Sequence, residues 1–144
     1  MNFLIINGPN LNMLGQRDPK QYGTGTYTEL CKLIEDWAKS RGDRVSFFQS
    51  NHEGAIIDTI QQARGRFDGM VINPGAYAHY SYAIYDALLD SPVPAIEVHI
   101  SDITSRDPWR RVSVTAPACV AMIAGHGFEG YWEAMEQLKE QVKC

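Results

Sequence analysis

The sequence predicts an α/β domain with a doubly wound parallel sheet of five strands, and three observations support this fold class. The chain has 144 residues, the usual size of one domain. Short apolar runs of strand length alternate with segments of helical periodicity. This alternation implies right-handed crossovers between parallel strands, with helices on both faces of the sheet. We therefore expect one domain over residues 1–144, in the common strand order 2-1-3-4-5 with its switch point between strands 1 and 3.

The individual elements follow from the same patterns. The expected strands are the apolar runs at residues 3–6, 45–48, 70–72, 95–98 and 120–124. Apolar faces with helical spacing run through residues 30–38, 56–63, 80–88 and 128–142. Two helix starts show capping-box spacing, Thr26 with Glu29 and Ser50 with Glu53. Gly42 stands where the C-cap of the first helix is expected.

Composition and charge exclude several classes of protein. The net charge is -4 and no basic run is long enough to follow a nucleic-acid backbone, so no nucleic-acid partner is expected. Cys31, Cys119 and Cys144 are odd in number and have no metal-ligand spacing, which indicates reduced thiols in a cytoplasm. No apolar stretch approaches the ~20 residues that span a bilayer, and the start of the chain lacks the basic region of a signal peptide. We expect a soluble, cytoplasmic protein without a bound metal or a membrane partner.

Hydrogen-bond donors and titratable side chains collect where the expected strands end. They are Asn7, Asn10, Arg17 and Tyr22 after the first strand, Asn73 and His79 after the third, and His99, Ser101, Arg106 and Arg110 after the fourth. The carboxyl ends of parallel strands meet at one edge, and ligands of such sheets bind there. Loops are polar in any case, so composition alone leaves both a functional site and ordinary turn chemistry open. The loop at residues 99–118 is long for a compact domain, which favours a functional role.

Arg17 and Tyr22 lie five positions apart in a stretch bounded by glycines, with Pro19 expected to block a helix between them. A free tyrosine has a pKa near ~10 and is no base at neutral pH, but a guanidinium ~4 Å away stabilises a phenolate by on the order of 4 kcal/mol. Arg17, together with Arg106 if its loop reaches that far, would make Tyr22 a proton acceptor. The alternative is a surface tyrosine beside a solvated arginine.

Several histidines and backbone amides are further candidates. His99 directly follows the fourth strand, and Glu97 lies two residues earlier on the same side, where its carboxylate can orient the imidazole and favour a general acid. A structural histidine is the alternative. The amides of Ile100 and Ser101 could hold a carboxylate, or they merely begin a loop. His79 opens the third predicted helix, whose dipole disfavours its cation, so a neutral hydrogen-bonding role is expected.

The segment "GHGFEG", residues 125–130, has the letters of a dinucleotide-binding fingerprint after a predicted strand. Only fourteen residues follow it, so the second strand and its acidic ribose ligand have no place. We interpret these glycines as tight packing between a strand and a helix, and we expect no cofactor.

Five blocks of sequence resemble the type II 3-dehydroquinate dehydratases in order and spacing, over essentially the full chain. They are "INGPNLNMLGQRDPKQYG", "FFQSNHEGAIID", "GMVINPGAYAHYS", "PAIEVHISDI" and "GHGFEGY". The resemblance implies a flavodoxin-like fold and a dodecamer of four trimers. It also implies a carbon-oxygen lyase that converts 3-dehydroquinate to 3-dehydroshikimate through an enolate, without metal or cofactor. Such an enzyme serves the shikimate pathway of aromatic amino acid biosynthesis or quinate breakdown.

The resemblance also implies roles for single residues. Tyr22 matches the base, Arg17 the lid arginine that supports its ionised form, and His99 the acid, with Glu97 behind it. Asn10 would hold the water that stabilises the enolate. The residues that match substrate-binding positions are Asn73, His79, Asp86 from a neighbouring subunit, Ile100, Ser101, Arg106 and Arg110. A flexible lid at about residues 15–25 would close over the substrate and exclude water.

The chain departs from the family pattern at Tyr85, Asp102 and Thr104. Asp102 would weaken the binding of a carboxylate if its side chain pointed inward. Two alternatives to a dehydratase are considered: a flavodoxin-like module that holds FMN at the switch point, and an inactive oligomeric scaffold of the same family. "GPNLN" lacks the hydroxyl-rich phosphate loop that the first requires, and intact Tyr22, Arg17 and His99 argue against the second.

Overall fold

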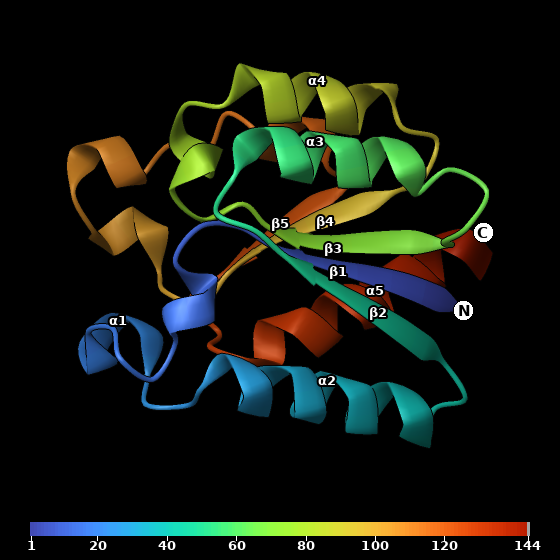
Figure 1. Ribbon diagram of the computed structural model, residues 1–144, viewed down its shortest axis with the longest axis horizontal. Coiled ribbons are helices and arrows are strands. Elements are labelled where there is room, and N and C mark those ends of the chain that lie inside the picture. Colours follow the sequence, from blue (N-terminus) through green and yellow to red (C-terminus); the bar gives the residue numbers. More distant parts are fainter. Residues whose placement is uncertain (144) are drawn as a thin grey trace.

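A five-stranded parallel sheet in the order β2-β1-β3-β4-β5 forms the centre of the computed structural model, which describes residues 1–143 (Figure 1). The strands are β1 Asn2–Asn7, β2 Arg44–Gln49, β3 Gly69–Asn73, β4 Ala95–His99 and β5 Ala121–Ala124. Every neighbouring pair is parallel. The predicted fold class, the strand order and the five predicted strands are confirmed, and the arrangement is flavodoxin-like.

Four helices cover the sheet, two on each face (Figure 1). They are α2 Tyr27–Ser40 and α5 Glu129–Lys143 on one face, and α3 Glu53–Gln62 and α4 Tyr82–Asp90 on the other. Successive side chains of a strand point to opposite faces, so β1 contributes to both hydrophobic clusters. Phe3 and Ile5 pack with α2 and α5, and Leu4 and Ile6 pack with α3 and α4. Burial on both faces explains why β1 is a continuous apolar run.

The first predicted helix boundary is confirmed. The Thr26 hydroxyl caps α2 by accepting a hydrogen bond from the Glu29 amide at 3.1 Å. At the other end, Gly42 follows the C-cap residue Arg41 and has φ +74°, a conformation that favours glycine. Leu33 is nevertheless exposed, as is Val142 in α5, so these two positions of the predicted apolar faces are wrong.

The second predicted capping box, Ser50 with Glu53, is wrong. Helix α3 begins at Glu53 with His52 at its N-cap, and no side chain caps it. The Ser50 hydroxyl accepts instead from the His52 amide at 2.9 Å. The Glu53 carboxylate accepts from the hydroxyl of Ser81, which also caps α4. A contact with a distant helix has therefore replaced the local capping pair.

The third helix begins later than predicted. Gly75–His79 forms a 3-10 turn, and α4 starts at Tyr82 after its N-cap Ser81. Tyr80 lies between these elements and is exposed, so its assignment to the buried face was wrong. His79 therefore ends a 3-10 turn and does not open the helix.

An ion pair holds α5 against the turn that leads into β2. Lys139 donates to the buried Asp43 carboxylate at 2.7 Å, as does the amino group of Met1. Burial alone would raise the pKa of Asp43, but these hydrogen bonds outweigh it and hold that pKa below its usual 3.8. The far end of α5 is thereby fixed, and its first turns carry Tyr131 toward the carboxyl edge of the sheet.

Two of the predicted reduced thiols, Cys31 and Cys119, form no disulfide, and Cys144 lies outside the described residues. Within residues 1–143 we find no helix whose length and apolar character would let it cross a membrane.

Candidate active site

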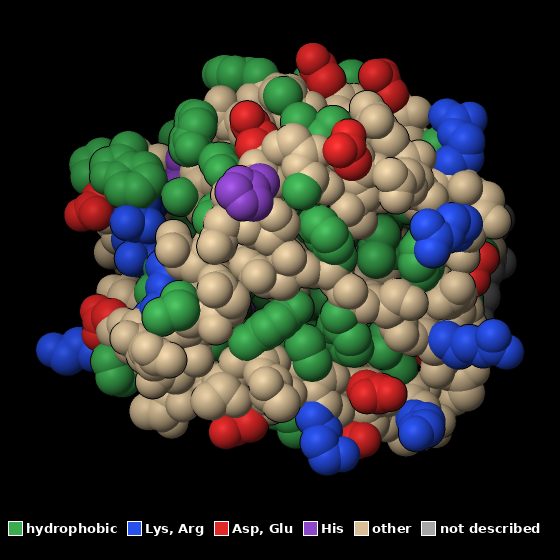
Figure 2. All heavy atoms as spheres, in the orientation of Figure 1, with side chains coloured by type: hydrophobic (Ala, Val, Ile, Leu, Met, Phe, Trp, Pro, Cys, Tyr) green, Lys and Arg blue, Asp and Glu red, His purple; other side chains and the backbone are tan. Residues whose placement is uncertain are grey.

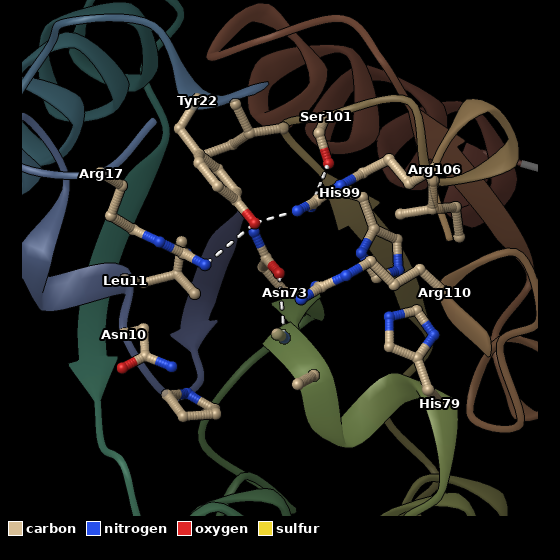
Figure 3. Close-up of a pocket in the computed structure, with 15 residues that line it drawn as sticks. Asn10, Leu11, Arg17, Tyr22, Asn73, His79, His99, Ser101, Arg106 and Arg110 are labelled. Atoms are coloured by element: carbon tan, nitrogen blue, oxygen red, sulfur yellow. Dashed lines mark hydrogen bonds between the residues drawn. The ribbon is translucent and has the colours of Figure 1, made fainter. Parts of the chain in front are cut away.

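A pocket (Figure 3) opens at the carboxyl edge of the sheet. The loops after β1, β3 and β4 gather at this edge (Figure 1). The pocket holds about 520 Å³ of space, counting its open mouth. Ten of the twelve predicted site residues line it, and the other two, Glu97 and Asp86, do not. The lining residues among the predictions are Asn10, Arg17, Tyr22, Asn73, His79, His99, Ile100, Ser101, Arg106 and Arg110.

The loops after β1 and β3 lie in direct contact at the switch point. The Gly8 amide donates to the Asn73 carbonyl at 2.7 Å. A Cβ atom on Gly8 would lie only 2.5 Å from the Pro74 carbonyl oxygen. Gly75 has φ +61°, and a Cβ atom added to it would lie 3.0 Å from the Pro9 carbonyl oxygen. Glycine is required on both sides of this contact, which brings Asn10 and Asn73 to one pocket wall.

Asn10 has a left-handed backbone conformation, with φ 69°. Its backbone amide donates a hydrogen bond to Asn51 Oδ1 at 3.0 Å, which holds this conformation in place. The Asn10 side chain does not cap the 3-10 turn Leu11–Met13 that follows, so its amide group remains available at the pocket (Figure 3). The Tyr77 hydroxyl donates to the Asn51 carbonyl at 2.8 Å. Asn51 was not among the predicted residues, because it acts on Asn10 from 41 positions away.

A buried hydrogen-bond chain orients Asn73. Its Oδ1 accepts from the Gly75 amide at 3.1 Å, and its Nδ2 donates to the Tyr131 hydroxyl at 3.1 Å. Tyr131 in turn donates to Asn7 Oδ1 at 2.5 Å. Burial raises the pKa of Tyr131 above its usual value, so it stays a neutral phenol. An amide has two N–H groups, and the second one of Asn73 is left for a ligand.

Tyr22 and two arginines meet at one oxygen atom. Arg17 Nη2 donates to the Tyr22 oxygen at 2.9 Å and Arg106 Nη1 donates to it at 2.7 Å (Figure 3). The Arg17 guanidinium also lies over the Tyr22 ring, 3.7 Å from its centre. The predicted proximity of these three residues is confirmed. Two cationic donors therefore converge on one phenol oxygen.

The local structure of this stretch differs from the prediction. Pro19 does not block a helix but opens the short helix α1 Pro19–Tyr22, where its fixed φ suits the first position. Asp18 caps this helix by accepting from the Lys20 amide at 3.0 Å. Tyr22 is thus the last residue of a helical turn, which directs its ring to the pocket.

The pocket is strongly positive. Among residues 1–143, three guanidinium groups line it, those of Arg17, Arg106 and Arg110, and no carboxylate does. Basic side chains are visible at this edge of the molecule in Figure 2. Burial lowers the pKa of Arg17 below its usual value; Tyr22 opposes this shift, and Arg106 and Arg110 add to it. Such a field favours an anionic ligand.

His99 is paired with the carboxylate behind it. Its Nε2 lies 2.7 Å from Glu97 Oε2, and Glu97 is completely buried. The sequence spacing that placed both on one side of β4 therefore predicted a real contact. The Glu97 carboxylate also accepts from the hydroxyls of Ser113 and Thr115, two residues that were not predicted.

His79 lies beside His99, with ring centres 6.3 Å apart, and its Nδ1 hydrogen-bonds to the Val112 carbonyl at 2.8 Å. Burial lowers the pKa of His79, and the nearby His99 and Arg110 add to the shift, while the Val112 carbonyl opposes it. The expected neutral ring agrees with this direction, but the cause is burial and not the dipole of α4. The neutral tautomer donates from Nδ1, which leaves Nε2 as an acceptor.

The loop at residues 125–130 supports the exit of β4. Gly125 donates to the Ser101 carbonyl at 3.1 Å, and Gly127 to the Ile100 carbonyl at 3.2 Å. A Cβ atom on Gly130 would meet Val98 at 3.2 Å, so the packing interpretation of these glycines is confirmed. The amides of Ile100 and Ser101 themselves donate to no acceptor within residues 1–143. They remain free to bind an anion.

Two acidic residues that the sequence analysis singled out, Asp86 and Asp102, do not line the pocket. Asp86 is exposed on α4 and does not reach the pocket of its own chain. Asp102 is turned to Thr104, whose amide and hydroxyl donate to its Oδ1 at 3.0 and 2.6 Å. Since Asp102 does not line the pocket, the expected weakening of carboxylate binding does not follow. Over residues 1–143, no cluster of three or more His, Cys, Asp or Glu side chains could hold a metal ion.

Comparisons with known proteins agree on one family. The sequence pattern of the family "Dehydroquinase class II" matches residues 1–139. The 3-dehydroquinate dehydratase of Thermotoga neapolitana is 56% identical over 97% of this chain and 95% of its own length. That of Clostridium acetobutylicum is 52% identical over 99% of both chains. The crystal structure of type II dehydroquinase from Butyrivibrio crossotus superimposes with a TM-score of 0.95 at 50% identity, covering 96% of this chain and 97% of the other.

Proposed function

Because this chain belongs to the class II dehydroquinase family, we propose that it is a 3-dehydroquinate dehydratase, a hydro-lyase that removes water from 3-dehydroquinate to give 3-dehydroshikimate. The observation that carries the proposal is the Tyr22 oxygen held by two guanidinium groups, in the same pocket as the His99–Glu97 pair. An elimination needs a base and an acid on one substrate, and this pocket supplies a candidate for each.

The positive pocket would bind the substrate through its carboxylate. The second N–H of Asn73 and the free amides of Ile100 and Ser101, three residues that line the pocket, would donate to this carboxylate. The neutral His79 and the Arg110 guanidinium would bind substrate hydroxyls. Arg110 is held in place by Trp109, whose ring lies 4.0 Å from the guanidinium carbon.

Tyr22, as a phenolate, would remove a proton from C2 of the substrate. That proton is acidified by the neighbouring ketone at C3, so its loss gives an enolate. Arg17 and Arg106 stabilise the phenolate before the transfer, and a water held by Asn10 would stabilise the enolate oxygen. No metal or cofactor takes part in this scheme.

His99 would then protonate the hydroxyl that leaves C1. Its Nε2 is engaged by Glu97, so Nδ1 is the nitrogen that transfers the proton. For this step the ring would carry a proton on both nitrogens, and Glu97 would hold it in place through Nε2. The stretch at residues 15–25, which carries both Arg17 and Tyr22, would act as a lid that opens for substrate and product.

We propose that the enzyme assembles as a dodecamer of four trimers, in which Asp86 completes the site of a neighbouring subunit. Asp86 is exposed on α4, and this helix also exposes the large side chains of Tyr82 and Leu89. Light scattering on the purified protein is expected to give about 194 kDa, twelve times the 16.2 kDa chain. A fully active species of 16.2 kDa would contradict the assembly.

Purified protein incubated with 3-dehydroquinate at neutral pH is expected to produce the ultraviolet absorbance of a conjugated enone. The rate is expected to be unchanged by EDTA, because the scheme uses no metal. Folded, oligomeric protein without this absorbance would reject the proposed activity and favour the inactive scaffold. A coloured chromophore that copurifies with the chain would favour the FMN-binding alternative.

A further inference from the structure

The carboxylate of Glu97 is fully buried and is surrounded by hydrogen-bond donors. Three side chains contact it: His99 at 2.7 Å and Ser113 at 2.6 Å reach Oε2, and the Thr115 hydroxyl reaches Oε1. A buried carboxylate without such donors would cost several kcal/mol. Ser113 and Thr115 lie 16 and 18 positions from Glu97, so the long loop supplies these donors from outside the strand.

The hydroxyl protons can serve only one acceptor each. If the Ser113 and Thr115 hydroxyls both donate to Glu97, the 3.2 Å contact between their oxygens is not a hydrogen bond at the same time. Ser113 Oγ accepts in turn from the Ala116 amide at 3.0 Å, which fixes its rotamer. An ionised carboxylate is acceptor-only and matches this set of donors, whereas a protonated carboxyl would bring a proton of its own.

The position of the Glu97 carboxylate affects the protonation pattern of the His99 ring. Glu97 Oε2 accepts from His99 Nε2, and Nδ1 has no partner within residues 1–143. A neutral imidazole carries one N–H, and an acceptor at Nε2 selects the tautomer with the proton there. The orientation of the carboxylate therefore decides which nitrogen of His99 is presented to the pocket.

We propose that Ser113 and Thr115 are positioning residues for the acid side of the site: their hydroxyls hold the Glu97 carboxylate aimed at Nε2 of His99, so that Nδ1 faces the ligand. The inference rests on the proposed function in taking His99 as the proton donor. Neither hydroxyl belongs to a residue that lines the pocket, so their effect is exerted through Glu97.

The loop that carries these hydroxyls is itself fixed near the site. The Val114 amide donates to the Ala78 carbonyl at 2.7 Å, and the Val112 carbonyl binds His79. Burial and the adjacent Glu97 raise the pKa of Cys119 to about 12, so this thiol stays neutral and does not compete for the His99 proton. The segment at residues 112–115 thus holds His79 directly and His99 through Glu97.

The test replaces the Thr115 hydroxyl by a methyl group of the same size. Thr115→Val is expected to lower kcat about tenfold, which is about 1.4 kcal/mol in the barrier, with KM within about twofold. Thr115→Ser keeps the hydroxyl and is expected to restore kcat to within about threefold, and Ser113→Ala is expected to behave like Thr115→Val. Thr104→Val is the matched control, because that hydroxyl also donates to a carboxylate in the same loop, but an exposed one outside the pocket.

A purely structural role would give a different result. It predicts a lower melting temperature for Thr115→Val and Ser113→Ala, with kcat of the folded fraction unchanged, and this result would overturn the proposal. A Thr115→Ser variant as slow as Thr115→Val would overturn it as well. Should Thr115→Val fail to fold, the Ser113→Ala and Thr115→Ser variants still decide the question.

A second measurement separates this inference from the proposed activity. Spectra of protein labelled with ¹⁵N-histidine, recorded at a pH high enough to keep the rings neutral, report which ring nitrogen carries the proton. His99, assigned by comparison with His99→Gln, is expected to be protonated at Nε2 in the wild type and to populate the other tautomer in Thr115→Val. Wild-type protonation at Nδ1 would reject the inference. The expected spectra in a protein without dehydratase activity would reject the activity and leave the positioning role standing.

Discussion

Replacing Tyr22 with phenylalanine is expected to lower kcat for 3-dehydroquinate by about a thousandfold while KM stays within about threefold. The variant keeps the aromatic ring that lies under Arg17, so the lid stretch retains its packing. It removes only the oxygen on which Arg17 and Arg106 converge. If this oxygen is the base, the chemical step loses its proton acceptor, and the carboxylate pocket that binds the substrate is unaffected.

Steady-state kinetics with the enone absorbance assay measures both parameters, and thermal unfolding checks that the fold is intact. Tyr80→Phe is the matched control, because its hydroxyl is exposed and outside the pocket. That variant is expected to retain wild-type kcat. A Tyr22→Phe enzyme that turns over within tenfold of the wild type would exclude Tyr22 as the base, since water or another side chain would then be accepting the proton.

The elements that sequence reasoning predicted best depend on local or periodic signals. The apolar runs of β1, β3 and β4 became strands that are buried on both faces of the sheet, and the strand order is the common one for a five-stranded doubly wound sheet. The contact between Glu97 and His99 was also predictable, because residues two apart in a strand share one side. Tyr22 and Arg17 are five positions apart, so a single turn brings them together.

The predictions that failed depend on partners distant in the chain. Glu53 was paired with Ser50 by spacing, but Ser81 of α4, 28 positions away, donates to it instead. Ser113 and Thr115 stand in a loop without periodicity, and nothing in their local sequence indicates that they reach Glu97. The contact of Asn51 with Asn10 was not predicted for the same reason. Spacing rules describe one element at a time, whereas these contacts are created when separate elements pack together.

The same limit applies to the arginines, since the sequence placed Arg106 near the lid without fixing its contact. The structure gives the Tyr22 oxygen two donors of nearly equal length, Arg106 at 2.7 Å and Arg17 at 2.9 Å. Arg106 also donates to the Ser101 hydroxyl at 3.2 Å, so its removal would disturb the carboxylate pocket. Within residues 1–143, Arg17 hydrogen-bonds only to Tyr22, so its removal gives the cleaner experiment.

Arg17→Ala is expected to lower kcat about a hundredfold, about 2.7 kcal/mol, with a small change in KM. A guanidinium beside a phenolate in a partly buried site contributes on this order, and Arg106 is left to supply the rest. Lys20→Ala is the control, because it removes an exposed cation from the same helical turn.

The decisive comparison is made in the Tyr22→Phe background. If Arg17 acts through the phenol oxygen, adding Arg17→Ala there is expected to cost less than about threefold in kcat, because two residues that serve one interaction are not additive. If Arg17 instead binds the substrate or merely holds the lid closed, its removal would cost the same hundredfold in both backgrounds. Equal losses in the two backgrounds would therefore show that Arg17 does not act through Tyr22. They would also contradict the claim that a guanidinium makes this phenol a base at neutral pH.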